Sequence, residues 1–488
     1  MSRFLGLDVG TQSTKAMLVD VASGVILAKA SAVHRMVENL APRHMEQDPR
    51  QWTDAVIQAC GELAASDPYA MRSVEGISVC GQQHGLVALD GSGTPVRHAK
   101  LWCDTSTELE AAELSARFSA PIPVGFTASK VLWMMRHEPV LWSKVATVLL
   151  PHDYINFWLT GEACFEDGDG SGTGWFDPIQ RSPIPSRVAA LELEQRIPRH
   201  AEALSIIGQL RPALAESLGL RAGIPVATGS GDNMMSALGC GAVFPSAFGL
   251  SLGTSGTIFT QINQPVQDSA GDLALFCDAI GGWLPLLCVM NMAQVPSVLL
   301  KMCGQSTDQR LMAAASEKAA RIREGSDGLM LLPFLVGERV PNLPLATGTL
   351  LGLTEANASL PHLLRCALEG TALNLAAGFR RFSQAQVRCE VFHAVGGGAA
   401  HALWLQILAD CLGSPIGVLV EQESAALGAA LHAAWSVGKQ GPKGTASTVS
   451  RQEFLAVNRW VTPNATSSAI YMQLLARFEE SVQRFSRS

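Results

Sequence analysis

Short runs of apolar residues alternate with longer segments of helical spacing along most of this chain. Near the N-terminus, apolar and polar positions alternate over residues 4–9, 16–21 and 25–30, which predicts three successive strands. Residues 51–65 have helical spacing, and the apolar run 74–79 predicts a fourth strand. The same patterns predict strands at 86–89, 224–228 and 391–395, and helices at 130–136, 151–159, 234–238, 401–412, 424–437 and 467–485. Strands that alternate with helices in both halves indicate an α/β fold.

Three segments depart from this alternation. Residues 164–177 are rich in Gly and Asp and predict a loop with no room for a core, and residues 439–450 predict a polar loop. The longest apolar run, residues 283–300, is interrupted by Asn291 and Pro296. This run therefore predicts a strand followed by a core helix rather than a membrane span.

One nine-residue pattern occurs twice, once in each half of the chain. Residues 6–14 read GLDVGTQST and residues 249–257 read GLSLGTSGT, with five of the nine positions identical. Each copy predicts a strand, a tight Gly-Thr turn and a second strand. Such a turn can hold a phosphate with its N–H groups and hydroxyls, although two ordinary hairpins would look the same. The duplication favours two similar domains that face each other across a nucleotide, with Asp8 as the single carboxylate that a bound Mg²⁺ needs.

Length and composition agree with a two-domain enzyme. A chain of 488 residues exceeds what one core usually supports, so we expect domains at residues 1–244 and 245–488. The net charge of −7 with scattered basic residues argues against a nucleic-acid partner. Eleven dispersed cysteines without a C-x-x-C pair, and an N-terminal apolar stretch that is soon interrupted, predict a cytoplasmic protein without a signal peptide.

Asp232 is the candidate catalytic base. It follows an apolar strand and a Gly-Ser-Gly turn, and a predicted helix begins just after Asn233. A carboxylate held at such a turn can accept a proton from a substrate hydroxyl. The alternative is an N-cap aspartate whose only role is to accept hydrogen bonds from the helix.

Two further glycine-flanked turns carry candidate binding groups. Gln83 and His84 follow a predicted strand, and their donors and acceptors suit a polyhydroxylated ligand, although a lone His is more often structural. Gly396, Gly397 and Gly398 lie between a strand and a helix, where the backbone either approaches a ligand closely or forms an ordinary loop. These glycines match neither the dinucleotide-binding pattern nor the P-loop pattern, which disfavours both of those protein classes.

Taken together, these motifs resemble the FGGY family of carbohydrate kinases, in the actin, hexokinase and Hsp70 superfamily, and within that family the bacterial xylulokinases. The resemblance runs across nearly the whole chain. It rests on GLDVGT (6–11), GQQHG (81–85), GFTASK (125–130), LPHDY (150–154), GDN (231–233), SLGTSG (251–256), GERVP (337–341) and GGGA (396–399). Each motif alone is modest, and their order along the chain makes the combination specific.

The resemblance implies two ribonuclease-H-like domains with the active site in a cleft between them, ATP as co-substrate, Mg²⁺ as the metal and a homodimer as the assembly. By the match of motifs, Asp232 would take the proton from the sugar hydroxyl, and Asp8 would lie beside the metal and the phosphates. Gln83, His84 and Asn233, together with Asp232, would contact the sugar. The implied nucleotide-binding residues are Thr11, Gln12, Thr254, Ser255, Gly397, Gly398 and Ala399.

The implied activity is ATP-dependent phosphorylation of a ketopentose, with D-xylulose as the expected sugar and D-xylulose 5-phosphate as the product. Several positions depart from the family pattern. Gln83 stands where Met is usual, Cys103 stands where Asn is common, residues 118–124 are shortened and Pro-rich, and residues 340–344 also differ. These departures leave other sugars of the family open, namely ribulose, a deoxyketose or a polyol.

Two functions from other classes also stay open. A non-catalytic sugar sensor with the same fold would be expected to have lost Asp8 or Asp232, and both are present. An ATPase that acts on a protein partner would show ATPase activity without sugar, and it would leave Gln83 and His84 unexplained.

Overall fold

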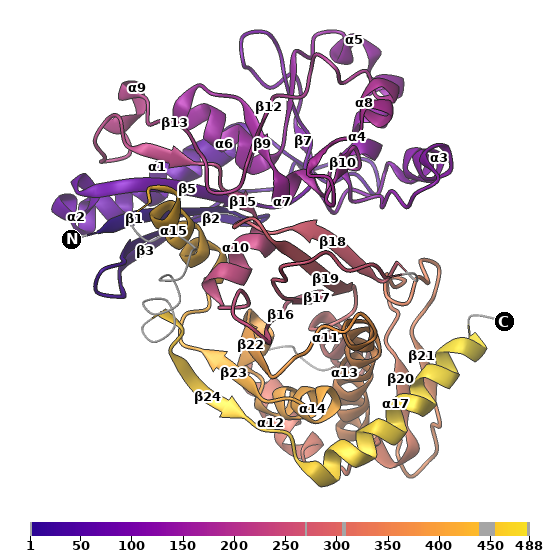
Figure 1. Cartoon of the computed structure of the whole chain (residues 1–488). Coiled ribbons are helices and arrows are strands. Elements are labelled where there is room, and N and C mark those ends of the chain that lie inside the picture. Colours follow the sequence, from indigo (N-terminus) through magenta and orange to yellow (C-terminus); the bar gives the residue numbers. More distant parts are fainter. Residues whose placement is uncertain (1, 269–270, 305–308, 439–453, 486–488) are drawn as a thin grey trace.

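Two seven-stranded sheets, one in each half of the chain, form the framework of the molecule (Figure 1). The computed structural model describes residues 2–268, 271–304, 309–438 and 454–485, so the loop predicted at 439–450 lies outside the described residues. The N-terminal sheet has the order β13 (Ile206–Gln209), β14 (Pro225–Ala227), β5 (Val74–Gly81), β1 (Arg3–Val9), β2 (Ser13–Asp20) and β3 (Val25–Val33), with β15 (Ser230–Gly231) also beside β5. The C-terminal sheet has the order β18 (Leu273–Cys277), β19 (Trp283–Val289), β17 (Gly256–Phe259), β16 (Ala247–Leu252), β22 (Val391–Val395), β23 (Ile416–Leu419) and β24 (Val457–Val461).

The two sheets repeat one plan. In each sheet, the first strand of the repeated motif, β1 or β16, pairs antiparallel with the next strand and parallel with a strand from later in the sequence, β5 or β22. A second parallel strand and then an antiparallel strand follow, β14 and β13 in one half and β23 and β24 in the other. The α/β fold with two similar domains is therefore confirmed, and the exact boundary at residue 244 stays a prediction.

Both copies of the repeated motif form the predicted hairpins. The N–H of Gly10 donates to the carbonyl oxygen of Ser13 at 3.1 Å, and the N–H of Gly253 donates to the carbonyl oxygen of Ser255 at 3.0 Å. Each turn therefore joins two antiparallel strands at the end of its sheet.

Alternation along β1 decides which side of the N-terminal sheet meets the other half of the chain. The side chains at positions 5, 7 and 9 pack against α1 (Pro49–Ser66). Phe4 and Gly6 face the opposite side, where α15 (Ser424–Ser436) lies against the sheet (Figure 1). Because successive side chains of a strand point to opposite faces, Asp8 lies on the face of the sheet that meets α15.

Helices α10 (Asp232–Gly239) and α15 cross in direct backbone contact at the junction of the two halves. A Cβ atom at Gly239 would lie 1.9 Å from the carbonyl oxygen of Ser424, and one at Gly428 would lie 1.8 Å from the carbonyl oxygen of Met235. Apolar side chains of α10 also join a core cluster with Phe259 and other residues of the C-terminal sheet. Each half of the chain thus covers one sheet face of the other half.

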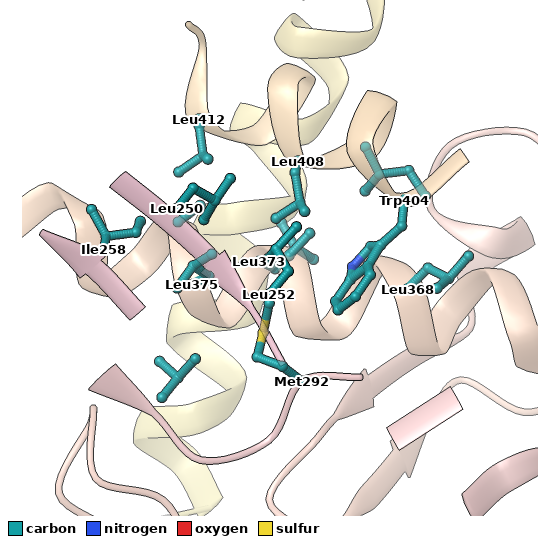
Figure 2. Close-up of a cluster of buried hydrophobic side chains, with 14 of the residues drawn as sticks. Leu250, Leu252, Ile258, Met292, Leu368, Leu373, Leu375, Trp404, Leu408 and Leu412 are labelled. Atoms are coloured by element: carbon teal, nitrogen blue, oxygen red, sulfur yellow. The ribbon is translucent and has the colours of Figure 1, made fainter. Parts of the chain in front are cut away.

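The largest core cluster lies on the opposite face of the C-terminal sheet (Figure 2). Leu250 and Leu252 of β16 and Ile258 of β17 pack there against α13 (Leu360–Gln384) and α14 (Ala402–Leu412). Since Leu250 and Leu252 point to this core, Ser251 points to the other face, on the side of α10. The two copies of the repeated motif therefore present Asp8 and Ser251 to the region where the two halves meet.

Every strand and helix predicted from the apolar pattern is present, with ends that differ by a few residues. The run 283–300 forms β19 followed by α11 (Gln294–Met302). Within the ranges that the structure describes, we find no helix with the length and apolar character needed to cross a membrane.

The other helices are α2 (Pro68–Arg72), α3 (Glu108–Phe118), α4 (Thr127–His137), α5 (Pro139–Trp142), α6 (Pro151–Thr160), α7 (Asp167–Gly170), α8 (Pro185–Ala190), α9 (Pro212–Ala215), α12 (Gln309–Ala319) and α17 (Ala465–Phe485), with short 3₁₀ turns η1 (Ser326–Gly328) and η2 (Gly397–Ala400). Short strand pairs are β4 (Glu46–Gln47) with β7 (Ala99–Lys100), β6 (Val87–Leu89) with β8 (Thr147–Leu149), β9 (Cys164–Glu166) with β12 (Arg199–Ala201), β10 (Phe176–Asp177) with β11 (Ser182–Pro183), and β20 (Met330–Leu332) with β21 (Thr349–Leu351).

The prediction of a loop at 164–177 is wrong. This segment contains β9, α7 and β10, and every residue from 164 to 176 is buried. The glycines that favoured a loop instead let the backbone pack tightly against its neighbours. A Cβ atom at Gly168 would lie 2.3 Å from the hydroxyl of Ser230, for example.

Candidate active site

Strand register places Asp8 between a cation and a thiol. Asp8 is paired with Lys15 on β2 and with Cys80 on β5. The Lys15 ammonium lies 4.0 Å from Asp8 Oδ2, and the Cys80 thiol donates to Asp8 Oδ1 at 3.4 Å. Burial raises the pKa of Asp8, and the charge of Lys15 opposes that rise. Lys15 also forms an ion pair with Glu423, just before α15, so this cation links Asp8 to the C-terminal half.

Asp232 lies on the other side of β5 from Asp8. Ser230 is paired with Cys80 on β5, and α10 begins two residues later at Asp232. The N-cap of α10 is Gly231, so the structure does not place Asp232 at the capping position. Burial first, and then the carboxylates of Asp8 and Asp169, raise the pKa of Asp232 to about 7. A carboxyl with a pKa near neutrality suits a general base.

Asn233 and Gln83 form a hydrogen-bonded pair beside Asp232. The amide nitrogen of Asn233 donates to Gln83 Oε1 at 2.8 Å and to Asp232 Oδ1 at 3.0 Å. Gly231 permits this approach, because a Cβ atom there would lie 2.6 Å from Gln83 Cγ. Gln83 Nε2 is buried and has no hydrogen-bond partner among the described residues. A buried donor of this kind is costly without a partner, and a ligand hydroxyl would supply one.

His84 lies where the two halves of the chain meet. Its backbone has a φ of +66°, and its ring lies between Phe126, at 5.1 Å, and Phe276 of β18, at 5.8 Å between centroids. Burial lowers the pKa of His84 to about 4, so the imidazole is neutral at physiological pH. The main-chain N–H of His84 donates to Asp169 Oδ1 at 3.3 Å.

Thr11 and Gln12 lie in the turn that follows Asp8. The Thr11 hydroxyl donates to Gln82 Oε1 at 3.2 Å and accepts from Trp102 Nε1 at 3.1 Å. The Gln12 side chain is exposed. The structure therefore brings Thr11 close to the turn that carries Gln83 and His84.

The predicted nucleotide-binding residues of the C-terminal half form a separate group. Thr254 is exposed in the turn after β16, and Ser255 is half-buried beside it. Gly398 packs against the same strand, since a Cβ atom there would lie 2.8 Å from Leu252 Cβ. The backbone of Gly397 is exposed, and a Cβ atom there would meet no atom within 4 Å. Over the described parts of the chain, no hydrogen bond or ion pair joins the group formed by Thr254, Ser255, Gly397, Gly398 and Ala399 to the group around Asp8 and Asp232.

The sequence interpretation missed several residues at this site. Asp169 accepts the main-chain N–H of His84, and His152 Nδ1 lies 3.0 Å from Asp169 Oδ2. Lys15 and Cys80 flank Asp8 through strand pairing. The available signal for His152 was its position in the LPHDY motif, whereas Asp169 lay in a segment interpreted as a loop.

Comparison with known proteins identifies the class. The model of the N-terminal domain of the FGGY family of carbohydrate kinases matches residues 3–239, and the model of the C-terminal domain matches residues 249–437. The chain therefore belongs to the FGGY family of carbohydrate kinases. As a carbohydrate kinase, it uses ATP as co-substrate and a small-molecule sugar as acceptor.

Particular relatives narrow the comparison. The chain is 35% identical over 454 residues to the xylulose kinase of Haemophilus influenzae. The matched region covers 89% of this chain and 91% of the relative. It is 34% identical to the xylulose kinase of Streptomyces rubiginosus over 99% of this chain and 95% of the relative. The solved structure of xylulose kinase from Rhodospirillum rubrum superposes with a TM-score of 0.91 at 27% identity over 99% of each chain.

Proposed function

We propose that this chain phosphorylates D-xylulose to D-xylulose 5-phosphate at the expense of ATP. The observation that carries the proposal is the group formed by Asp232, Asn233, Gln83 and His84. It combines a carboxyl of pKa about 7 with a buried amide donor that has no hydrogen-bond partner among the described residues, and both groups suit a sugar hydroxyl. The names of the relatives support D-xylulose as the sugar.

The chemistry follows from the positions of these side chains. Gln83, His84 and Asn233 hold the sugar by hydrogen bonds, which orients one hydroxyl toward Asp232. Asp232 accepts the proton of that hydroxyl as its oxygen forms a bond to the γ-phosphorus of ATP and the bond to the ADP oxygen breaks. The products are the sugar phosphate and ADP, with the proton on Asp232 before it is released to water.

Mg²⁺ fits the surroundings of Asp8. Magnesium sites of kinases take one or two carboxylates together with phosphate and water oxygens. Asp8 is a buried carboxylate that, among the described residues, accepts only a weak hydrogen bond from the Cys80 thiol, and the Lys15 ammonium lies 4.0 Å from it. Bound there, Mg²⁺ would neutralise charge on the phosphates.

The test of this function is ADP release by the purified protein with Mg-ATP and a panel of acceptors. The panel consists of D-xylulose, L-xylulose, D-ribulose, L-ribulose, ribitol and glycerol, with a control that has no acceptor. We expect selective stimulation by D-xylulose. Stimulation by another member would replace the sugar, and turnover that no sugar changes would favour an ATPase acting on a protein. No turnover with any acceptor would leave a sugar outside the panel or a sensor.

Gly397 offers a test of the nucleotide site. Replacing Gly397 by Val is expected to raise the KM for ATP about tenfold, because the side chain would occupy the open space where we place the nucleotide. The melting temperature is expected to stay unchanged, since a Cβ atom at Gly397 meets no neighbour. The matched variant Gly398→Ala should instead destabilise the fold, because its Cβ atom would overlap Leu252 and Trp404. An unchanged KM for ATP in Gly397→Val would remove this residue from the nucleotide site.

The cytoplasmic location and the homodimer stay predictions. The location follows from composition and the homodimer from the family, and light scattering on the purified protein measures the oligomeric state. A mass near the 51.8 kDa of one chain would contradict the dimer.

A further inference from the structure

The Gly- and Asp-rich segment 166–176 lies against the side chain of His84. A Cβ atom at Gly172 would lie 1.9 Å from His84 Cε1, so this segment touches the imidazole directly. The segment also supplies Asp169, which accepts the main-chain N–H of His84 at 3.3 Å. Thr127 donates its hydroxyl to the carbonyl oxygen of His84 at 3.1 Å. The main-chain N–H and carbonyl groups of His84 are therefore both held by hydrogen bonds, which supports its positive φ.

Asp169 is itself held by a contact with His152. Both residues are completely buried, and His152 Nδ1 lies 3.0 Å from Asp169 Oδ2. The other ring nitrogen of His152 lies 3.1 Å from Asp153 Oδ1. Although burial opposes the charge, these two carboxylates raise the pKa of His152 to about 9. A protonated His152 therefore occupies Asp169 Oδ2 and leaves Oδ1 to face His84.

Asp169 Oδ1 also lies near the ring of His84. The distance from His84 Nδ1 to Asp169 Oδ1 is 3.8 Å, and Nδ1 is buried without a hydrogen-bond partner among the described side chains and backbone. At this distance Asp169 Oδ1 is an acceptor close to Nδ1, and a shorter approach would let Nδ1–H donate to the carboxylate. A neutral imidazole that donates from Nδ1 has an acceptor lone pair on Nε2.

We propose that Asp169 is a positioning residue that holds His84 as the Nδ1–H tautomer, so that Nε2 accepts a hydrogen bond from a hydroxyl of the sugar. This inference rests on the proposed function, because it assigns a role to His84 in sugar binding. It gives the glycine-rich segment a function as well: because Gly172 has no Cβ atom, the segment can approach the imidazole and place Asp169 Oδ1 near Nδ1.

Steady-state kinetics of Asp169→Asn test the proposal. The amide has nearly the same shape, but it no longer offers His84 a charged acceptor. We expect the KM for D-xylulose to rise about tenfold while the KM for ATP changes less than about twofold. The matched control is Asp167→Asn in the same turn, because Asp167 pairs with Arg181 and His200 rather than with His84. Equal changes in both KM values, or an unchanged KM for the sugar, would overturn the proposal.

A double-mutant cycle separates positioning from general structural support. If Asp169 acts through His84, Asp169→Asn should have no further effect on the sugar KM once His84 is replaced by Ala. Additive effects of the two substitutions would mean that Asp169 supports the site in another way, and the proposal would then fail.

Nitrogen-15 NMR of the histidine side chains tests the wild-type protein directly. The His84 signals are identified by their loss in His84→Gln, and we expect the pattern of the Nδ1–H tautomer. The Nε2–H tautomer would contradict the proposal, even if Asp169→Asn does not fold. Because this measurement needs no turnover, it decides the positioning role separately from the panel of sugars, which decides the proposed function.

Discussion

The Asp232→Asn variant is expected to lose about 10²- to 10⁴-fold in turnover while it still binds ATP. The amide keeps the shape of the side chain at the start of α10, but it cannot accept the proton of the sugar hydroxyl. ATP binding should be retained, because the predicted nucleotide-binding residues of the C-terminal half have no hydrogen bond to Asp232 among the described residues. ADP release measures the first effect, and calorimetry with ATP measures the second.

A matched carboxylate on the surface controls for the loss of charge. Asp54→Asn removes an exposed carboxylate on α1, and its turnover should equal that of the wild type. Retained sugar phosphorylation in Asp232→Asn would exclude the residue as the base. Loss of ATP binding in the same variant would show that Asp232 acts on the nucleotide instead.

The pH profile gives an independent signature of the same carboxyl. Burial, with help from Asp8 and Asp169, raises the pKa of Asp232 to about 7, and only the ionised form can accept a proton. Activity is therefore expected to rise with pH up to about 7, and kcat/KM for the sugar should fall about tenfold per pH unit well below that value. The residual activity of Asp232→Asn should lack this acid limb. A limb of the same midpoint in that variant would assign the titration to another group.

Local pattern in the sequence was sufficient for the elements and for part of the site. The hairpin over residues 4–21 was predictable from alternation, and it places Lys15 opposite Asp8. The approach of Cys80 to Asp8 was not predictable in this way, because it depends on the parallel pairing of β1 with β5, and parallel pairing leaves no local signal.

The segment around Asp169 shows why the rest of the site was missed. Its Gly and Asp residues are typical of a loop, and burial depends on a close fit that no local pattern describes. Gly172 lies against His84, and Ser171 accepts the main-chain N–H of Cys277 at 3.0 Å. Those contacts join parts of the chain that are far apart in sequence. Candidate catalytic and binding residues were therefore predicted where a motif carried them, and the residues that contact and support them were not.

Replacing Gly428 by Ala is expected to destabilise the protein by about 3 kcal/mol or more and to lower turnover with it. The new Cβ atom would lie 1.8 Å from the carbonyl oxygen of Met235 and 3.0 Å from the amide nitrogen of Gly239. Both neighbours are backbone atoms of α10, so no side chain can rotate away to relieve the overlap. The helices α10 and α15 must therefore separate, and Asp232 at the start of α10 moves with them.

A shift of α15 is expected to lower both the stability of the fold and the turnover. A substitution on another helix serves as the control. Glu423 precedes α15 and pairs with Lys15, the cation beside Asp8, so a shift of α15 disturbs both candidate catalytic carboxylates. Gly61→Ala in α1 adds a methyl group where a Cβ atom meets nothing within 4 Å. It should leave turnover unchanged and stabilise the fold by up to about 1 kcal/mol, since Ala favours helix over Gly. Thermal melting and ADP release compare the two variants. Wild-type melting in Gly428→Ala would mean that α10 and α15 are not in backbone contact, and normal turnover in a destabilised variant would separate the packing of these helices from the geometry of the site.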